Sequence, residues 1–182
     1  MKIRVLVSCS SERIEFIDCI KRTCEEYKNE YKDELEYHFI PTETAPLDEK
    51  DRLDRMLSLA NESDIIFMDV TPKRYSLNGK EEHLTNQGVL IEYGVLLAPS
   101  YFMRLCLFCE DSKSRSLLHP YFIKTVHDYS LEKLNDKKAP KSLRRQVKEV
   151  INNYKNRLPE RVRKLQEENE AMQNITNIRK KG

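Results

Sequence analysis

An uninterrupted run of large apolar residues, Ile65-Ile66-Phe67-Met68, constrains the fold of this 182-residue chain more than any other segment. A strand that is exposed on one face alternates apolar with polar residues, whereas a continuous apolar run is typical of a strand covered on both faces. Such strands occur at the centre of parallel sheets that have helices on either side. The run therefore predicts an α/β protein. The residues that follow it, Asp69-Val70-Thr71-Pro72, are expected at the carboxyl edge of the sheet.

Strand-like and helix-like segments alternate on both sides of this run. We expect a helix from Ser10 or Ser11 whose buried face carries Ile14, Ile17, Ile20 and Cys24, and another helix from Asp48. The alternation predicts an α/β domain over residues 1–140, with a parallel sheet of about five strands. The other strands are expected at residues 3–9, 36–40, 104–110 and 125–129.

The charge of the chain is unevenly distributed. Residues 141–182 carry twelve Lys or Arg against five Asp or Glu, so the overall net charge of +2 leaves −5 for residues 1–140.

No signal peptide and no stretch of about 20 apolar residues is present, which predicts a cytoplasmic protein without a membrane span. Five cysteines, an odd number, fit a reducing compartment, and Cys106 and Cys109 are expected to point to opposite faces of a strand rather than to bind a metal.

The last 42 residues, 141–182, form a charged and basic segment with a narrow apolar stripe that predicts a helical extension. The part before Pro159 is expected to pack on the body. The part after it has too few apolar residues to bury much, which leaves a solvated helix or a homo-oligomer contact as alternatives. Nucleic acid is disfavoured as a partner, because Glu167, Glu168 and Glu170 interrupt the positive charges.

One ionisable residue, Glu92, lies inside the otherwise apolar segment 86–98. The surrounding residues predict a helix that is buried nearly all round. Burial of a charge is costly, so a carboxylate in this place either has a partner or lines a site where it is used.

Two further polar groups are expected at the same edge of the sheet as Glu92. The loop with Ser8 and Ser10 follows the first strand, where it either faces a ligand or merely caps a helix. Asp69 ends the central strand, where it either serves the site or forms a turn with its own backbone. Between Asp69 and Glu92, residues 73–87 are polar and show neither helical nor strand periodicity, so we expect a loop of about fifteen residues, long enough for a lid or substrate-facing insertion.

Two short motifs carry a resemblance to a known family. The segment Ser63-Asp64-Ile65-Ile66-Phe67-Met68-Asp69-Val70-Thr71-Pro72 resembles a hydrophobic strand ending in Asp-x-Thr, and Asn86-Gln87-Gly88-Val89-Leu90-Ile91-Glu92-Tyr93-Gly94 resembles an Asn-Val-x-x-Glu-x-Gly helix start. Both are similar to the nucleoside 2-deoxyribosyltransferase-like and TIR-like superfamily, and this resemblance implies a flavodoxin-like three-layer sandwich for the α/β domain. The likeness covers residues 1–130, and the long segment 73–87 departs from the family pattern.

The resemblance implies chemistry at an N-glycosidic bond of NAD or a related nucleotide. It implies Glu92 as the catalytic carboxylate, without a metal or a separate cofactor. Asp69 would bond the ribose hydroxyls or assist the departure of the base. Ser8, Ser10, Thr71, Asn86 and Tyr93 would line the substrate site. The alternatives are a nucleoside 2-deoxyribosyltransferase, and a module that binds or senses nucleotides without turnover.

Overall fold

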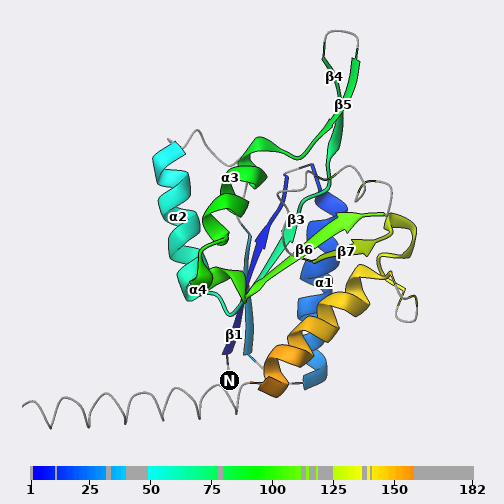
Figure 1. Ribbon diagram of the computed structural model, residues 1–182. Helices are drawn as coiled ribbons and strands as arrows, with labels where there is room; N and C mark the ends of the chain where they lie inside the picture. The colour runs from blue at the N-terminus through cyan, green and yellow to red at the C-terminus, as the bar shows by residue number, and fades with distance from the viewer. Residues whose placement is uncertain are drawn as a thin grey trace, which may run out of the picture. The chain divides into compact units, whose positions relative to one another are not determined.

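The computed structural model of the protein contains a five-stranded sheet, a separate two-stranded hairpin, and helices on both faces of the larger sheet (Figure 1). The strands of the sheet are β1 (Lys2–Ser8), β2 (Glu34–Phe39), β3 (Ile65–Asp69), β6 (Leu105–Glu110) and β7 (Val126–Tyr129). The helices are α1 (Ile14–Tyr31), α2 (Glu49–Glu62), α3 (Gln87–Leu96), α4 (Pro99–Phe102), the 3-10 turn η1 (Leu131–Lys133), and a C-terminal helix at residues 143–157. The structure describes residues 2–10, 12–31, 34–39, 49–77, 80–111, 114, 118, 125–136, 139 and 141–157.

All neighbouring strands of the sheet are parallel, in the order β2-β1-β3-β6-β7. β3 lies between β1 and β6, and all five of its residues are buried. The prediction of an α/β fold with a parallel sheet flanked by helices, built on a central apolar strand, is therefore confirmed. Since all five strands run in one direction, their carboxyl ends meet at a single edge, where folds of this kind place their ligands.

The face of the sheet under α1 is filled by aromatic rings. Phe16 of α1 lies 5.9 Å from Phe108 and 5.6 Å from Tyr129 between ring centroids, and Phe67 lies 5.7 Å from Phe108. The buried face of α1 carries Phe16, Cys19, Ile20, Thr23, Cys24 and Tyr27. The predicted face was wrong at its first residue, because Ile14 is 61 % exposed. Helical spacing alone allows either phase here, and the larger ring of Phe16 takes the core position.

The opposite face of the sheet is covered by α2, α3 and α4. Met56 and Ala60 of α2, and Val89, Tyr93 and Leu96 of α3, pack in one apolar cluster with Leu6, Ile66 and Met68 of the sheet. The expectation that α3 is buried nearly all round was wrong, since Leu90 is 40 % and Ile91 is 53 % exposed. Its buried residues instead follow the i, i+3, i+4, i+7 pattern of a helix with one covered face.

The segment 73–87, expected to be a loop, contains an antiparallel hairpin, so that expectation was wrong. Strand β4 (Lys73–Leu77) pairs with β5 (Lys80–Leu84), from the rung Lys73↔Leu84 to the rung Leu77↔Lys80. The sequence Asn78-Gly79 separates the two strands, and Asn-Gly between strands is the strongest short-range signal for a hairpin. This signal was present in the sequence and outweighed the weak periodicity of the flanking residues.

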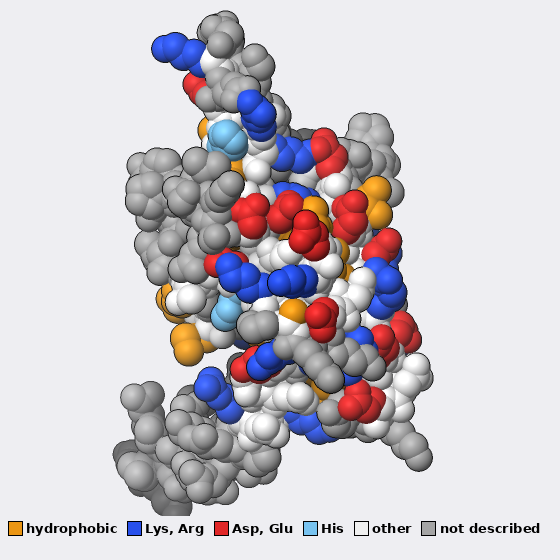
Figure 2. Space-filling model, turned by 90° about the vertical axis from the view of Figure 1, so that its right-hand side faces the viewer, with side chains coloured by type: hydrophobic (Ala, Val, Ile, Leu, Met, Phe, Trp, Pro, Cys, Tyr) orange, Lys and Arg blue, Asp and Glu red, His pale blue; other side chains and the backbone are white. Residues whose placement is uncertain are grey.

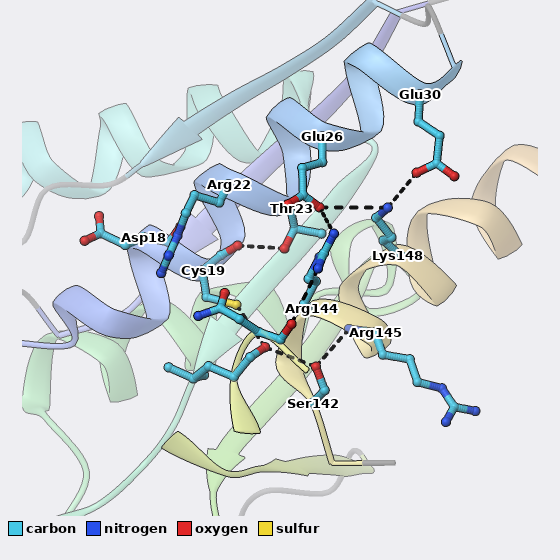
Figure 3. Close-up of polar contacts among 12 residues, drawn as sticks. Asp18, Cys19, Arg22, Thr23, Glu26, Glu30, Ser142, Arg144, Arg145 and Lys148 are labelled. Atoms are coloured by element: carbon cyan, nitrogen blue, oxygen red, sulfur yellow. Dashed lines mark hydrogen bonds and ion pairs between the residues drawn. The ribbon is translucent and has the colours of Figure 1, made fainter. Parts of the chain in front are cut away.

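The chain divides into two compact units, Met1–Lys148 and Glu149–Gly182. Within the first unit, the start of the C-terminal helix is held against α1 by ion pairs from Arg144 to Glu26 and from Lys148 to Glu30, the second at 2.6 Å (Figure 3). Ser142 and Cys19 both donate to the carbonyl of Leu134, at 3.1 and 3.4 Å (Figure 3). The expected extension beyond residue 157, including Pro159 and the proposed homo-oligomer contact, lies outside the described residues.

Over the described part of the chain, no helix combines the length and the apolar character that crossing a membrane requires.

Two neighbouring positions of α1 test the corrected phase of this helix. Replacement of Phe16, which is 1 % exposed, with Ala should lower the free energy of unfolding by about 3–5 kcal/mol, since it removes a ring from the core. Ile14→Ala, at the exposed first position of the helix, should change it by less than about 0.5 kcal/mol. Urea denaturation of both variants measures the difference, and equal losses would contradict the orientation described for α1.

Candidate functional site

Glu92 is held in the interior by the way α3 begins. The side-chain oxygen of Asn86 caps the helix by accepting from the backbone N–H of Gly88 at 2.9 Å and of Val89 at 3.4 Å. This start places Glu92 on the same buried stripe as Val89 and Tyr93, with only 2 % of its surface exposed. The hydroxyl of Ser8 donates a hydrogen bond to Oε2 of Glu92.

The pair formed by Ser8 and Glu92 lies where the order of the sheet reverses. Ser8 is the last residue of β1 and stands opposite Met68 of β3 in the strand register. The chain leaves β1 toward β2 on one side and returns to β3 on the other, so the connections diverge between β1 and β3. In open parallel sheets this divergence opens a crevice at the carboxyl ends of the two strands, which is the usual ligand site.

Asp69, the last residue of β3, is buried and fully engaged by the protein. Its Oδ1 accepts from the backbone N–H of Thr71 at 3.0 Å and from the Thr71 hydroxyl. Its Oδ2 accepts from the hydroxyl of Tyr129 at 3.1 Å and pairs with Nε of Arg13 at 3.3 Å. The turn expected as one alternative for Asp69 is confirmed, and it is joined by an ion pair that the sequence did not reveal.

Arg13 links three elements at the carboxyl edge. Besides Asp69 it contacts Oε2 of Glu110, at the end of β6, through Nη1 at 2.5 Å. Burial alone would lower the pKa of Arg13, but Asp69, Tyr129 and Glu110 raise it above its ordinary value, so the guanidinium stays charged. The sequence signal for this residue was its place in the loop between the first strand and the first helix, at the same edge as Asp69.

Burial also shifts the pKa values of Asp69 and of its partner Tyr129. Loss of solvent raises the pKa of Asp69 above its usual range, opposed by Arg13 and by the hydrogen bonds from Thr71 and Tyr129. The pKa of the Tyr129 hydroxyl is raised far above normal by burial and by the neighbouring carboxylate. Tyr129 therefore remains a neutral hydrogen-bond donor at any physiological pH.

Cys9, the residue after β1, is influenced by both carboxylates. Burial raises the pKa of its thiol, and the charges of Asp69 and Glu92 raise it further. A thiol with a raised pKa stays protonated, so Cys9 does not have the properties of a nucleophilic cysteine.

The remaining predicted residues differ in what they contact. Ser10 is 7 % exposed, and its carbonyl accepts from the N–H of Arg13 at 2.9 Å. The hydroxyl of Thr71 bonds Asp69 and accepts from the N–H of Glu110 at 2.8 Å. Tyr93 is 4 % exposed and belongs to the apolar cluster under α3.

All five cysteines are free thiols. Cys109 is buried and Cys106 is half-buried, in line with alternation along β6. Among the described residues, no group of three or more His, Cys, Asp or Glu side chains is arranged to hold a metal ion.

No protein-family model matches the chain. Curated proteins and solved structures likewise give no match. The function of the site is therefore argued from its own geometry.

Removal of the Arg13 charge should reveal the cost of burying Asp69. In Arg13→Met the carboxylate loses its guanidinium partner, so the free energy of unfolding should fall by about 3–5 kcal/mol at neutral pH. The variant raises the pKa of folded Asp69 further above its ordinary value. The loss is therefore complete at a pH above the folded pKa of Asp69 in the variant. It shrinks as the pH falls through that pKa, and it is smallest where Asp69 is protonated in the folded state of both proteins.

Urea denaturation at neutral and at acidic pH measures this dependence. Arg22→Met is the matched control, because Arg22 is exposed and bonds only the carbonyl of Asp18 among the contacts described for it, at 3.2 Å. The control should show a small loss at both pH values. A loss in Arg13→Met that does not change with pH would contradict an ion pair with a buried Asp69.

Proposed function

We propose that the protein cleaves the N-glycosidic bond of NAD or a related nucleotide, with Glu92 as the catalytic carboxylate. The observation that carries this proposal is the buried pair of Ser8 and Glu92 at the divergence of β1 and β3. The strand order, which is 2-1-3-4-5 when the hairpin is left aside, is that of flavodoxin-like folds, which bind a nucleotide cofactor at this point. It supports the resemblance to the deoxyribosyltransferase-like and TIR-like superfamily.

The chemistry of the bond requires a carboxylate of this kind. Departure of the base from the sugar builds positive oxocarbenium character at the anomeric carbon. A carboxylate fixed close to that carbon stabilises the charge, or attacks the carbon and forms a covalent intermediate. Glu92 is suited to this role because it is built on a helix whose start is capped by Asn86, and because Ser8 orients one of its oxygens.

Asp69 has a different role in the proposed site. Its oxygens are engaged by Thr71, Tyr129 and Arg13, so we assign it to positioning rather than to direct contact with the sugar. Together with Arg13 it fixes the ends of β3 and β6 relative to the start of α1. Ser10 lies in the loop after β1 and Tyr93 follows Glu92 on α3, and we propose that they shape the site around the base or the ribose.

Replacement of Glu92 with Gln tests the catalytic role. Gln keeps the shape of the side chain and an oxygen that accepts from Ser8, but it cannot stabilise a cation or act as a nucleophile. Release of nicotinamide from NAD, or of base from deoxynucleosides, should fall by at least about a thousandfold. Chromatography of the released base measures the rate, and the urea midpoint verifies that the fold is intact.

The control for this variant is Glu132→Gln, which removes an exposed carboxylate from η1. It should keep full activity. Unchanged activity in Glu92→Gln would remove Glu92 from the mechanism. If the unaltered protein releases no base but binds the nucleotide, the protein is a sensing module, and transfer of the sugar to an added base would make it a deoxyribosyltransferase.

Ser8→Ala tests whether the hydroxyl orients the carboxylate. A hydrogen bond to a charged group contributes about 1.5–3 kcal/mol, so kcat should fall by about 10- to 100-fold while KM changes little. Ser142→Ala is the control, since Ser142 is equally buried but bonds the carbonyl of Leu134. Steady-state kinetics distinguish the two variants, and an equal loss of kcat in both would show that the effect is one of general packing.

A further inference from the structure

The side chains to which we assign roles in the proposed reaction are shut off from solvent. None of Ser8, Ser10, Asp69, Glu92 and Tyr93 is more than 7 % exposed. A carboxylate that acts on a sugar has to touch it, and a nucleotide cannot reach Glu92 in this arrangement. If the site works as proposed, the structure is its closed state, and a segment at the carboxyl edge moves before a nucleotide enters.

Two segments that leave the carboxyl ends of β1 and β3 are joined by an ion pair. Lys73, the first residue of β4, pairs with Glu12 in the loop between β1 and α1. We call this contact the outer ion pair. It connects the loop after β1 with the base of the hairpin after β3, and the pair formed by Ser8 and Glu92 lies where these two strands end.

A second ion pair joins the same segments, but it is of a different kind. Arg13 and Asp69 form this inner ion pair, in which the side chains are only 16 % and 1 % exposed. Breaking a buried pair leaves an uncompensated charge and is strongly unfavourable. In the outer ion pair, the side chain of Glu12 is 67 % exposed. An exposed pair changes an equilibrium by a factor of about five or less and is screened by salt, so the outer ion pair separates while the inner one stays closed.

The hairpin of β4 and β5 is able to move as a unit. Its strands form a sheet of their own and project from the body (Figure 1). A two-stranded ribbon has little packing of its own and belongs to the less stable parts of a fold. Its far end is held next to α3, because the hydroxyl of Thr85 donates to the carbonyl of Val70 at 3.0 Å and the next residue, Asn86, caps the helix. Loss of the outer ion pair thus frees one end of the hairpin and leaves the other attached.

The distribution of charge favours the closed position. Figure 2 shows Lys or Arg and His side chains on the projecting hairpin, above a band of acidic side chains on the body. Opposite charges attract the hairpin toward the body, and the outer ion pair is the printed contact at its base that uses this attraction.

We propose that the outer ion pair of Lys73 and Glu12 is the closing contact of the site, and that its separation lets the hairpin move and opens Glu92 to a nucleotide. The inference rests on the function proposed above and deepens it, because it names the element that controls access to the buried carboxylate. When the hairpin closes again, it excludes water from the bound nucleotide.

Cys9 is a natural reporter of this opening. It follows Ser8 in the chain, is 2 % exposed, and is close enough to Asp69 and Glu92 for their charges to raise the pKa of its thiol. Opening brings the thiol into contact with solvent and removes part of the burial that raises this pKa, so alkylation by N-ethylmaleimide becomes faster. Cys24, which is 0 % exposed in the core under α1, is the internal reference for unfolding of the whole protein.

Reversal of one charge tests the closing contact. Lys73→Glu places a carboxylate opposite Glu12, so the pair repels instead of attracting. The rate of alkylation of Cys9, measured by peptide mass spectrometry on the full-length protein, should rise at least about threefold, whereas the rate at Cys24 should not change. Adding Glu12→Lys to this variant restores opposite charges with the positions exchanged, and it should return the rate at Cys9 to that of the unaltered protein.

Lys80→Glu is the matched control. It makes the same change of charge on the same hairpin, at an exposed position opposite Leu77. It should leave the alkylation of Cys9 unchanged. The inference is overturned by an unchanged rate at Cys9 in Lys73→Glu, by an equal rise in Lys80→Glu or at Cys24, or by failure of the exchanged pair to restore the rate.

These measurements need no substrate, so they are independent of the catalytic proposal, and turnover is measured separately. Faster alkylation of Cys9 in Lys73→Glu, without release of base by the unaltered protein, would leave the opening in place and refute the glycosidase. Release of base by the unaltered protein, with alkylation of Cys9 that does not respond to Lys73→Glu, would support the glycosidase and refute the outer ion pair as the closing contact.

Discussion

The burial of two carboxylates at one edge of a parallel sheet is the constraint on which the rest of this structure depends. Asp69 and Glu92 are 3 % and 2 % exposed, and neither position tolerates a charge without partners. The protein meets this requirement from several elements at once. Arg13 comes from the loop before α1, Tyr129 from β7, and Ser8 from the end of β1, so the two acids connect most of the carboxyl edge. Parallel strands bring all their carboxyl ends together, so polar residues from several strands gather around Asp69 and Glu92. The same parallel sheet is covered by helices on both faces, which produces the apolar layers.

The two acids differ in the kind of partner that binds them. Asp69 is bound by a guanidinium, a phenol, a hydroxyl and a backbone N–H, an arrangement that holds its position and uses its acceptor capacity within the protein. The bond that Ser8 donates to Glu92 comes from a small neutral side chain at the point where the sheet order reverses. A neutral donor orients a carboxylate without neutralising it. The position of the Ser8–Glu92 pair at this reversal, where open parallel sheets bind their ligands, is the reason why our proposal assigns the chemistry to Glu92.

The sequence predicted the parts of this arrangement that depend on local pattern. The run Ile65–Met68 located the central strand, and the isolated Glu92 located an inward-facing carboxylate. What it could not supply were contacts across the fold: Ser8 and Glu92 are 84 residues apart, and Arg13 meets Asp69 only because α1 begins above the end of β3. The phase of α1 was misjudged because Ile14 and Phe16 are both apolar and only packing against Phe108 separates them. The hairpin was missed although the sequence contains a sufficient local signal for it, Asn78-Gly79. The residues around this signal lack strand periodicity, and that favoured the prediction of a loop.

The position of the hairpin follows from the same division between rigid and adaptable parts. Groups that take part in bond cleavage need fixed geometry, and the residues to which we assign roles in the proposed reaction lie on β1, β3 and α3, whose buried faces are packed in the core. Groups that distinguish one substrate from another can lie on a less stable element, provided that its base is fixed to the site. The ion pair of Lys73 with Glu12 and the bond of Thr85 to Val70 provide this attachment at both ends of the ribbon. The insertion between Asp69 and Glu92 thus forms a sheet of its own and leaves the buried environment of both carboxylates intact.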